Sequence, residues 1–174
     1  MVALEQRQTV SPVGDLLSGP MFSFATSEGT AHTSISVLVA DASGPWRDFV
    51  RVTLAPLPGV RLLDVVSNGI DAIEKSHKLK PDVLLLDLQL PGLSGLETVR
   101  RIRDLRLITK ALIVSLVADY DVVRAALQQG VSAYIHKLDF GTEVLAAMQA
   151  SLQDKVYLSN EIRRINVSSS SPKH

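Results

Sequence analysis

Four polar side chains with the chemistry of phosphoryl transfer stand at the ends of four short apolar runs. They are Asp41, Asp87, Ser115 and Lys137. Carboxylates can hold a hard divalent cation such as magnesium through oxygen ligands, and an aspartate can act as nucleophile toward phosphorus, forming an acyl phosphate. A lysine and a hydroxyl can then neutralise and hydrogen-bond the phosphoryl oxygens. Each residue alone would be an ordinary polar residue closing a strand, so its significance depends on what brings the four together.

Strand-like and helix-like patterns alternate five times from residue 35 onward. The run at 83–86 is apolar without alternation, which is typical of a strand buried on both faces of a parallel sheet. The expected strands are 35–40, 60–66, 83–86, 111–115 and 131–136, and each is followed by a segment with helical spacing of apolar residues. This order predicts a doubly wound α/β domain with a five-stranded parallel sheet in the order 2-1-3-4-5. The carboxyl ends of its strands share one edge, so the four polar side chains should converge there.

The composition sets the broad class of the protein. Its 174 residues are 46% hydrophobic, enough for a packed core, and 18 basic residues balance 18 acidic ones. The balanced charge provides no overall field toward nucleic acid or anionic lipid. No cysteine is present, which excludes disulfides and thiol chemistry, and the longest apolar runs have only the length of strands. We therefore expect a cytoplasmic protein without a membrane segment and without direct contact to nucleic acid.

Four ordered motifs resemble the receiver domain of bacterial two-component response regulators. They are Val-Leu-Val-Ala-Asp at 37–41, Pro-Asp-Val-Leu-Leu-Leu-Asp-Leu-Gln-Leu-Pro-Gly-Leu-Ser-Gly-Leu-Glu at 81–97, Ala-Leu-Ile-Val-Ser at 111–115 and Gly-Val-Ser-Ala-Tyr-Ile-His-Lys at 130–137. The resemblance covers residues 35–153 and implies the flavodoxin-like receiver fold. It is most similar to the subfamily that usually carries a LuxR-type helix-turn-helix output domain, because Tyr-Leu-Ser follows at 157–159.

The resemblance implies a role for each residue of the site. Asp87 would be the phosphoacceptor, and Asp41, Asp87 and the backbone carbonyl of Gln89 would hold Mg²⁺. Ser115 and Lys137 would bind the phosphoryl group. Tyr134 would be the aromatic switch that turns inward when Ser115 is engaged; without the resemblance, a half-buried strand aromatic is an equally good interpretation.

One position departs from the family pattern. Two adjacent acids normally follow the first strand, and this chain has Asp41 followed by Ala42. Asp48 lies more than a helical turn further on and is no evident substitute. Loss of a carboxylate removes a ligand and a negative charge, so magnesium should bind weakly and phosphorylation of Asp87 is put in question.

The remaining segments are expected to be accessory. Residues 1–34 are rich in Ser, Thr, Gly and Pro and are interpreted as a flexible arm. Residues 154–174 are interpreted as a short extension with a disordered end, and no helix-turn-helix pattern occurs in them. A short helix around residues 161–164 is the only element expected there.

The leading hypothesis is a stand-alone, non-enzymatic receiver that a sensor histidine kinase phosphorylates at Asp87. It would signal to a downstream protein, or form a homodimer, through the face of the fourth helix, fifth strand and fifth helix, including Val123, Leu127 and Tyr134. One alternative is a degenerate, phosphate-independent pseudo-receiver that acts as an interaction module, which Ala42 favours. Others are a transcription regulator that lacks its DNA-binding domain and, more remotely, an aspartate-dependent phosphatase.

Overall fold

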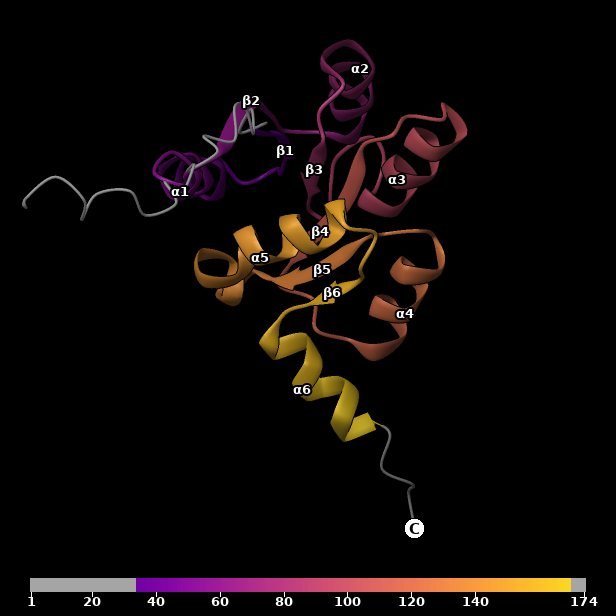
Figure 1. Ribbon diagram of the computed structural model, residues 1–174. Coiled ribbons are helices and arrows are strands. Elements are labelled where there is room, and N and C mark those ends of the chain that lie inside the picture. Colours follow the sequence, from indigo (N-terminus) through magenta and orange to yellow (C-terminus); the bar gives the residue numbers. More distant parts are fainter. Residues whose placement is uncertain (1–33, 170–174) are drawn as a thin grey trace, which may run out of the picture. The chain divides into compact units, whose positions relative to one another are not determined.

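The computed structural model describes residues 34–169, with side chains up to residue 165. The predicted flexible arm therefore lies outside the described residues except for Ser34, as does the end of the chain from residue 170. The described part has a parallel sheet between two layers of helices (Figure 1). None of its helices has the length and hydrophobicity needed to cross a membrane.

The sheet has six parallel strands in the order β2-β1-β3-β4-β5-β6, which confirms the predicted order and adds one strand. The strands are β1 (Ile35–Ala40), β2 (Val60–Val66), β3 (Val83–Leu86), β4 (Lys110–Ser115), β5 (Ala133–His136) and β6 (Tyr157–Leu158). The sixth strand was not predicted, because two residues are too few to show a period. It pairs with the outer edge of β5.

Helices follow each of the first five strands and cover both faces of the sheet. They are α1 (Gly44–Leu54), α2 (Gly69–Leu79), α3 (Gly95–Asp104), α4 (Tyr120–Gln128) and α5 (Phe140–Leu152); a 3₁₀ turn η1 (Lys137–Asp139) precedes α5, and α6 (Asn160–Ser169) follows β6. Buried side chains of α2, α3, α4 and α6 form one apolar cluster with the sheet, whereas those of α1 and α5 form the other. The fold is thus doubly wound, as the alternation predicts.

Side-chain caps fix the loops at the carboxyl edge of the sheet. Ser43 accepts a hydrogen bond from the Trp46 amide at the start of α1, and Pro45 occupies the first turn. Ser94 and Glu97 form a reciprocal capping box at the start of α3. Because the helix starts are held this way, the short loops between strands and helices have defined geometry where the polar residues lie.

Gly95 is required by a close approach of two backbone segments. A Cβ atom built at this position would collide with the carbonyl oxygen of Asp87 and lie 2.9 Å from the Cα of Leu88. Glycine therefore allows the start of α3 to pack directly against the backbone that follows β3, and its amide donates to the Leu88 carbonyl at 2.8 Å. This contact fixes the backbone at Asp87 against the start of α3.

Candidate functional site

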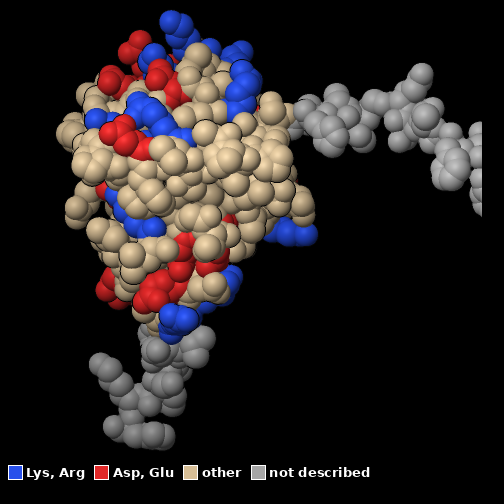
Figure 2. All heavy atoms as spheres, turned by 90° about the vertical axis from the view of Figure 1, so that its left-hand side faces the viewer, with Lys and Arg blue, Asp and Glu red and all other residues tan. Residues whose placement is uncertain are grey.

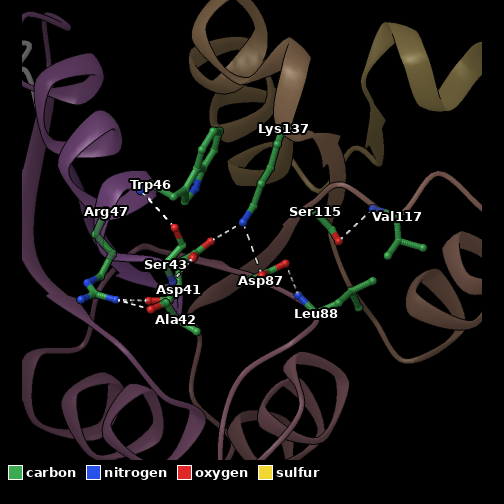
Figure 3. Close-up of polar contacts among 10 residues, drawn as sticks. All are labelled: Asp41, Ala42, Ser43, Trp46, Arg47, Asp87, Leu88, Ser115, Val117 and Lys137. Carbon is green, nitrogen blue, oxygen red and sulfur yellow. Dashed lines mark hydrogen bonds and ion pairs between the residues drawn. The ribbon is translucent and has the colours of Figure 1, made fainter.

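The structure brings three of the four strand-end residues into one ion-pair network. The ammonium of Lys137, which follows β5, donates to Asp41 Oδ2 at 2.6 Å and to Asp87 Oδ2 at 3.4 Å. Figure 3 shows this lysine reaching down between the two carboxylates, with Ser115 on the far side of Asp87. The Ser115 hydroxyl oxygen instead accepts from the Val117 amide at 3.2 Å. The predicted convergence at one sheet edge therefore occurs, with Ser115 beside the network rather than bonded into it.

Asp41 is the most deeply buried acid of the group, with 2% of its surface exposed. Its second oxygen, Oδ1, accepts from the Ser43 amide at 2.8 Å, which ties the loop before α1 to the carboxylate. Arg47 reaches back from α1 and donates to the backbone carbonyls of Asp41 and Ala42 at 2.7 and 2.8 Å. This arginine was not predicted from the sequence, although its position one turn into the helix after Asp41 is compatible with such a contact.

Asp87 follows β3 and keeps 14% of its side chain exposed, so one side of it opens to solvent. Burial raises the pKa of this carboxyl above its usual value, the charge of Lys137 opposes the rise, and the nearby charge of Asp41 adds to it. Its Oδ1 accepts from the Leu88 amide at 2.8 Å. The result is a partly desolvated carboxylate whose charged form is stabilised by Lys137 and by the Leu88 amide.

Trp46 forms the wall of the site next to Lys137. The lysine ammonium lies 4.8 Å from the centre of the Trp46 ring, a cation–π contact. The ring in turn packs edge-on against Phe140 at 5.5 Å and lies 4.9 Å from Phe49. This aromatic group restricts the positions open to Lys137 and places an intrinsic fluorophore at the site.

Tyr134 lies in β5 with none of its surface exposed, and its hydroxyl donates to the Val117 carbonyl at 2.8 Å. Burial raises its pKa to about 12, while a hydrogen bond with Ser115 lowers it. A ring nitrogen of His136 also lies 3.1 Å from the Leu116 carbonyl, so β5 holds the loop after β4 at two points. The side chain of Tyr134 is thus in the inward position in this structure.

Comparisons with known proteins match most of the described chain to one family. The family model described as the response regulator receiver domain matches residues 37–149. The chain belongs to this family. Its receiver domain is 35% identical over 129 residues to protein-glutamate methylesterase/protein-glutamine glutaminase 5 of Myxococcus xanthus, which is 73% of this chain and 37% of that protein. It is 28% identical over 127 residues to the nitrate/nitrite response regulator protein NarL of Escherichia coli, which is 73% of this chain and 59% of that protein.

Solved structures agree with this assignment. The signal receiver domain of a response regulator named NarL from Mycobacterium tuberculosis superposes with a TM-score of 0.66 at 28% identity, covering 69% of this chain and 97% of that one. The response regulator domain of Thermotoga maritima CheB gives a TM-score of 0.64 at 25% identity, covering 68% and 96%. The shared part is therefore the receiver domain, and the chain spans only about two-fifths to three-fifths of the curated relatives described above.

The magnesium ion expected of a receiver domain meets a reduced set of ligands. Asp41 and Asp87 offer carboxylate oxygens, and no group of three His, Asp or Glu side chains suited to a metal occurs within residues 34–169. Magnesium usually binds through one or two carboxylates and keeps several waters, so this pair fits it. The ammonium of Lys137 competes with the metal, because it pairs with both carboxylates and offsets one of their two negative charges. Asp48 does not replace the missing acid, since it is exposed and pairs with Arg51 at 3.0 Å.

The predicted partner face is partly covered in this structure. Val123 and Tyr134 are buried, and the outer edge of β5 is paired with β6. Residues 157–169 therefore do more than extend the chain, because they form a strand and a helix against the receiver domain. Contact with a downstream protein or a second copy through this face stays a prediction.

Proposed function

We propose that this receiver domain accepts a phosphoryl group on Asp87 from a sensor histidine kinase and passes the signal to a downstream protein by direct contact. The observation that supports it best is the network in which Lys137 pairs with Asp41 and Asp87 at the carboxyl edge of the sheet. The proposal places the domain in the cytoplasm and assigns it no enzymatic activity of its own. It names protein partners rather than nucleic acid or membrane.

In the proposed reaction an oxygen of the Asp87 carboxylate attacks the phosphorus of a phosphohistidine. The new O–P bond forms as the P–N bond breaks, and the histidine nitrogen keeps the electron pair of that bond. Lys137 already lies 3.4 Å from Asp87 and would pair with the added charge. The Ser115 hydroxyl, which now forms a hydrogen bond with Tyr134, would turn to donate to a phosphoryl oxygen. Magnesium held by Asp41, Asp87 and the Gln89 carbonyl would supply further neutralisation of charge.

A phosphate-independent pseudo-receiver is the second candidate, and Ala42 and Arg47 favour it. Ala42 stands where the family pattern has an acid, and the guanidinium of Arg47 binds its carbonyl at 2.8 Å. A fixed positive charge at this position weakens the attraction for a divalent cation. Under this candidate the domain would act as an interaction module whose site keeps Lys137 paired with the two carboxylates.

Phosphorylation with acetyl phosphate and magnesium separates the two candidates. Intact mass should show one added phosphoryl group on the wild type and none on Asp87→Asn, the isosteric control. If the wild type gains no mass but Ala42→Asp does, and Ala42→Asp/Asp87→Asn does not, the site is a pseudo-receiver that a single acid restores. A gain that persists in Asp87→Asn would contradict both candidates.

A further inference from the structure

Residues Tyr157 to Ile165, which comprise β6 and the first turns of α6, close the outer edge of the sheet. We refer to them as the clasp. Its strand runs parallel to β5, with Tyr157 opposite Ala133 and Leu158 opposite Tyr134. The Tyr157 amide donates to the Ser132 carbonyl at 3.1 Å and the Ser159 amide donates to the Tyr134 carbonyl at 3.0 Å. The clasp therefore satisfies backbone groups that would otherwise form an open strand edge.

Polar contacts from two acids hold the start of α6. Glu143 of α5 accepts from the Asn160 amide at 3.1 Å and from the Tyr157 hydroxyl at 2.7 Å. Asp139 accepts from the Glu161 amide at 2.8 Å. Although burial opposes it, hydrogen bonds from Ser159 and Glu161 lower the pKa of Asp139. The two carboxylates thus accept hydrogen bonds from the first free amides of α6 and cap its N-terminus, although they belong to an earlier part of the chain.

The apolar anchor of the clasp is small. Ile162 has none of its surface exposed and packs in the cluster that contains Val123, Ala126 and Tyr134. The two strand residues, Tyr157 and Leu158, are only partly buried. By contrast, α5 buries Phe140, Val144, Ala147 and Met148. Since local stability follows buried apolar contacts, the clasp should open at a lower free-energy cost than the rest of the domain.

The clasp also forms hydrogen bonds with the residues on either side of Lys137. The Ser159 hydroxyl accepts from the His136 amide at 2.9 Å, and Asp139 receives the Glu161 amide. Lys137 stands between these two residues in the chain, in the turn η1. A movement of this turn would therefore alter the hydrogen bonds of the clasp, and opening of the clasp would release the turn.

We propose that the clasp is a detachable cover over a binding groove formed by the β5 edge and α4, and that a partner segment of the same chemistry replaces it. Opening would expose an unpaired strand edge beside the apolar site that Ile162 fills. The groove fits a partner segment with two parts. An extended pair of apolar residues would add to the β5 edge as a strand, and an amphipathic helix after it would dock with one aliphatic side chain in the site of Ile162. This inference requires no phosphorylation of Asp87 and can hold for either candidate function.

Amide hydrogen exchange of the wild-type chain tests whether the clasp opens as a unit. The amides of Tyr157, Ser159, Asn160 and Glu161 should exchange with one common opening free energy, about a hundredfold faster than core amides of β3 and β4. Protection equal to that of the core strands would overturn the proposal, because the clasp would then open only when the whole domain unfolds.

A peptide of residues 155–169 tests the groove, with full-length wild type and Ile162→Asp as receptors. Because a closed clasp competes in cis, the apparent affinity falls by the fraction of molecules that are open. The labelled peptide should bind Ile162→Asp at least about tenfold more tightly than the wild type. The increase should roughly equal the inverse of the open fraction of wild-type molecules that hydrogen exchange gives. The same peptide carrying Ile162→Asp should bind neither receptor.

Equal binding of the peptide to both receptors would overturn the proposal, provided that β1 to β4 of the variant keep wild-type exchange protection. If Ile162→Asp does not fold, Ile162→Ala serves as the second receptor. This variant weakens the same anchor without burying a charge, and a smaller increase in affinity is expected. Absence of any increase would again count against the groove.

Discussion

Replacement of Lys137 by methionine should destabilise the domain far more than loss of an ordinary surface lysine. The ammonium is 10% exposed and lies 2.6 Å from Asp41 and 3.4 Å from Asp87, which are 3% and 14% exposed. At an effective dielectric constant of about 20, these separations of 2.6 and 3.4 Å correspond to attractions of about 6 and about 5 kcal/mol. Desolvation of the charges offsets much of this sum, so the expected loss is about 3–5 kcal/mol, the usual cost of removing one partner of a buried ion pair.

The loss should depend on pH in a defined direction. Burial raises the pKa of Asp87 and Lys137 counteracts it, so removal of the lysine raises this pKa further. A carboxyl whose pKa is higher in the folded than in the unfolded state binds its proton more tightly when folded, so stability increases as the pH falls through that range. The variant should therefore recover part of its lost stability as the pH is lowered from neutral to mildly acidic values.

Urea unfolding at neutral and at mildly acidic pH measures this effect, with Lys75→Met as the matched control. Lys75 also pairs with an aspartate, Asp64, at 2.9 Å, but both side chains are exposed to solvent. The control should change stability little, because an exposed ion pair contributes little. If Lys137→Met lost no more stability than Lys75→Met, the ammonium would not hold the two carboxylates together as described.

Three further perturbations test other parts of the site. Ala42→Asp should raise magnesium affinity about tenfold, or about 1.4 kcal/mol, in a titration followed by Trp46 fluorescence, and an unchanged curve would count against the missing-ligand argument. Burial raises the pKa of Tyr134 to about 12, so unfolding above pH 10 releases a proton that the folded state retains. The free energy of unfolding should therefore fall from pH 10 to 12 in the wild type and fall less in Tyr134→Phe. Parallel plots of unfolding free energy against pH for the two proteins would refute this. Gly95→Ala should lower the free energy of unfolding, measured by thermal unfolding, by about 1–3 kcal/mol, since the added methyl group meets the backbone of Asp87 and Leu88. It should also slow the modification of Asp87 by acetyl phosphate. Wild-type stability and rate would show that the loop adjusts freely.

Much of the architecture could be predicted because its signals are local and repeated. The unbroken apolar run before Asp87 and the helical spacing around it specify a buried strand and its neighbouring helices. Once parallel strands are inferred, Asp41 and Lys137 must approach Asp87 at the carboxyl edge, as the structure confirms. Tyr134 is buried in this structure, and its role as a switch stays a prediction; the sequence alone could not separate it from a half-buried strand residue.

Other features were beyond prediction because they arise from contacts between distant segments. Arg47 binds the carbonyls at the end of β1, yet an arginine on an amphipathic helix is ordinarily an exposed residue. Nothing in Tyr157-Leu158 alone identifies a strand, since only the free edge of β5 gives these residues a partner. Likewise Ile162 is one of three aliphatic residues in the largely polar α6, and it becomes a core residue only because α4 and β5 leave a site for it. In each case tertiary structure supplies the partner.

The most direct test of the central claim is to identify the residue that carries the phosphoryl group. After incubation with acetyl phosphate and magnesium, borohydride reduction converts an aspartyl phosphate to homoserine, and tandem mass spectrometry locates it. We predict homoserine at position 87 alone, with Asp41 unchanged although it shares Lys137. Modification at Asp41, or at another residue while Asp87 stays intact, would contradict the assignment of Asp87 as the phosphoacceptor.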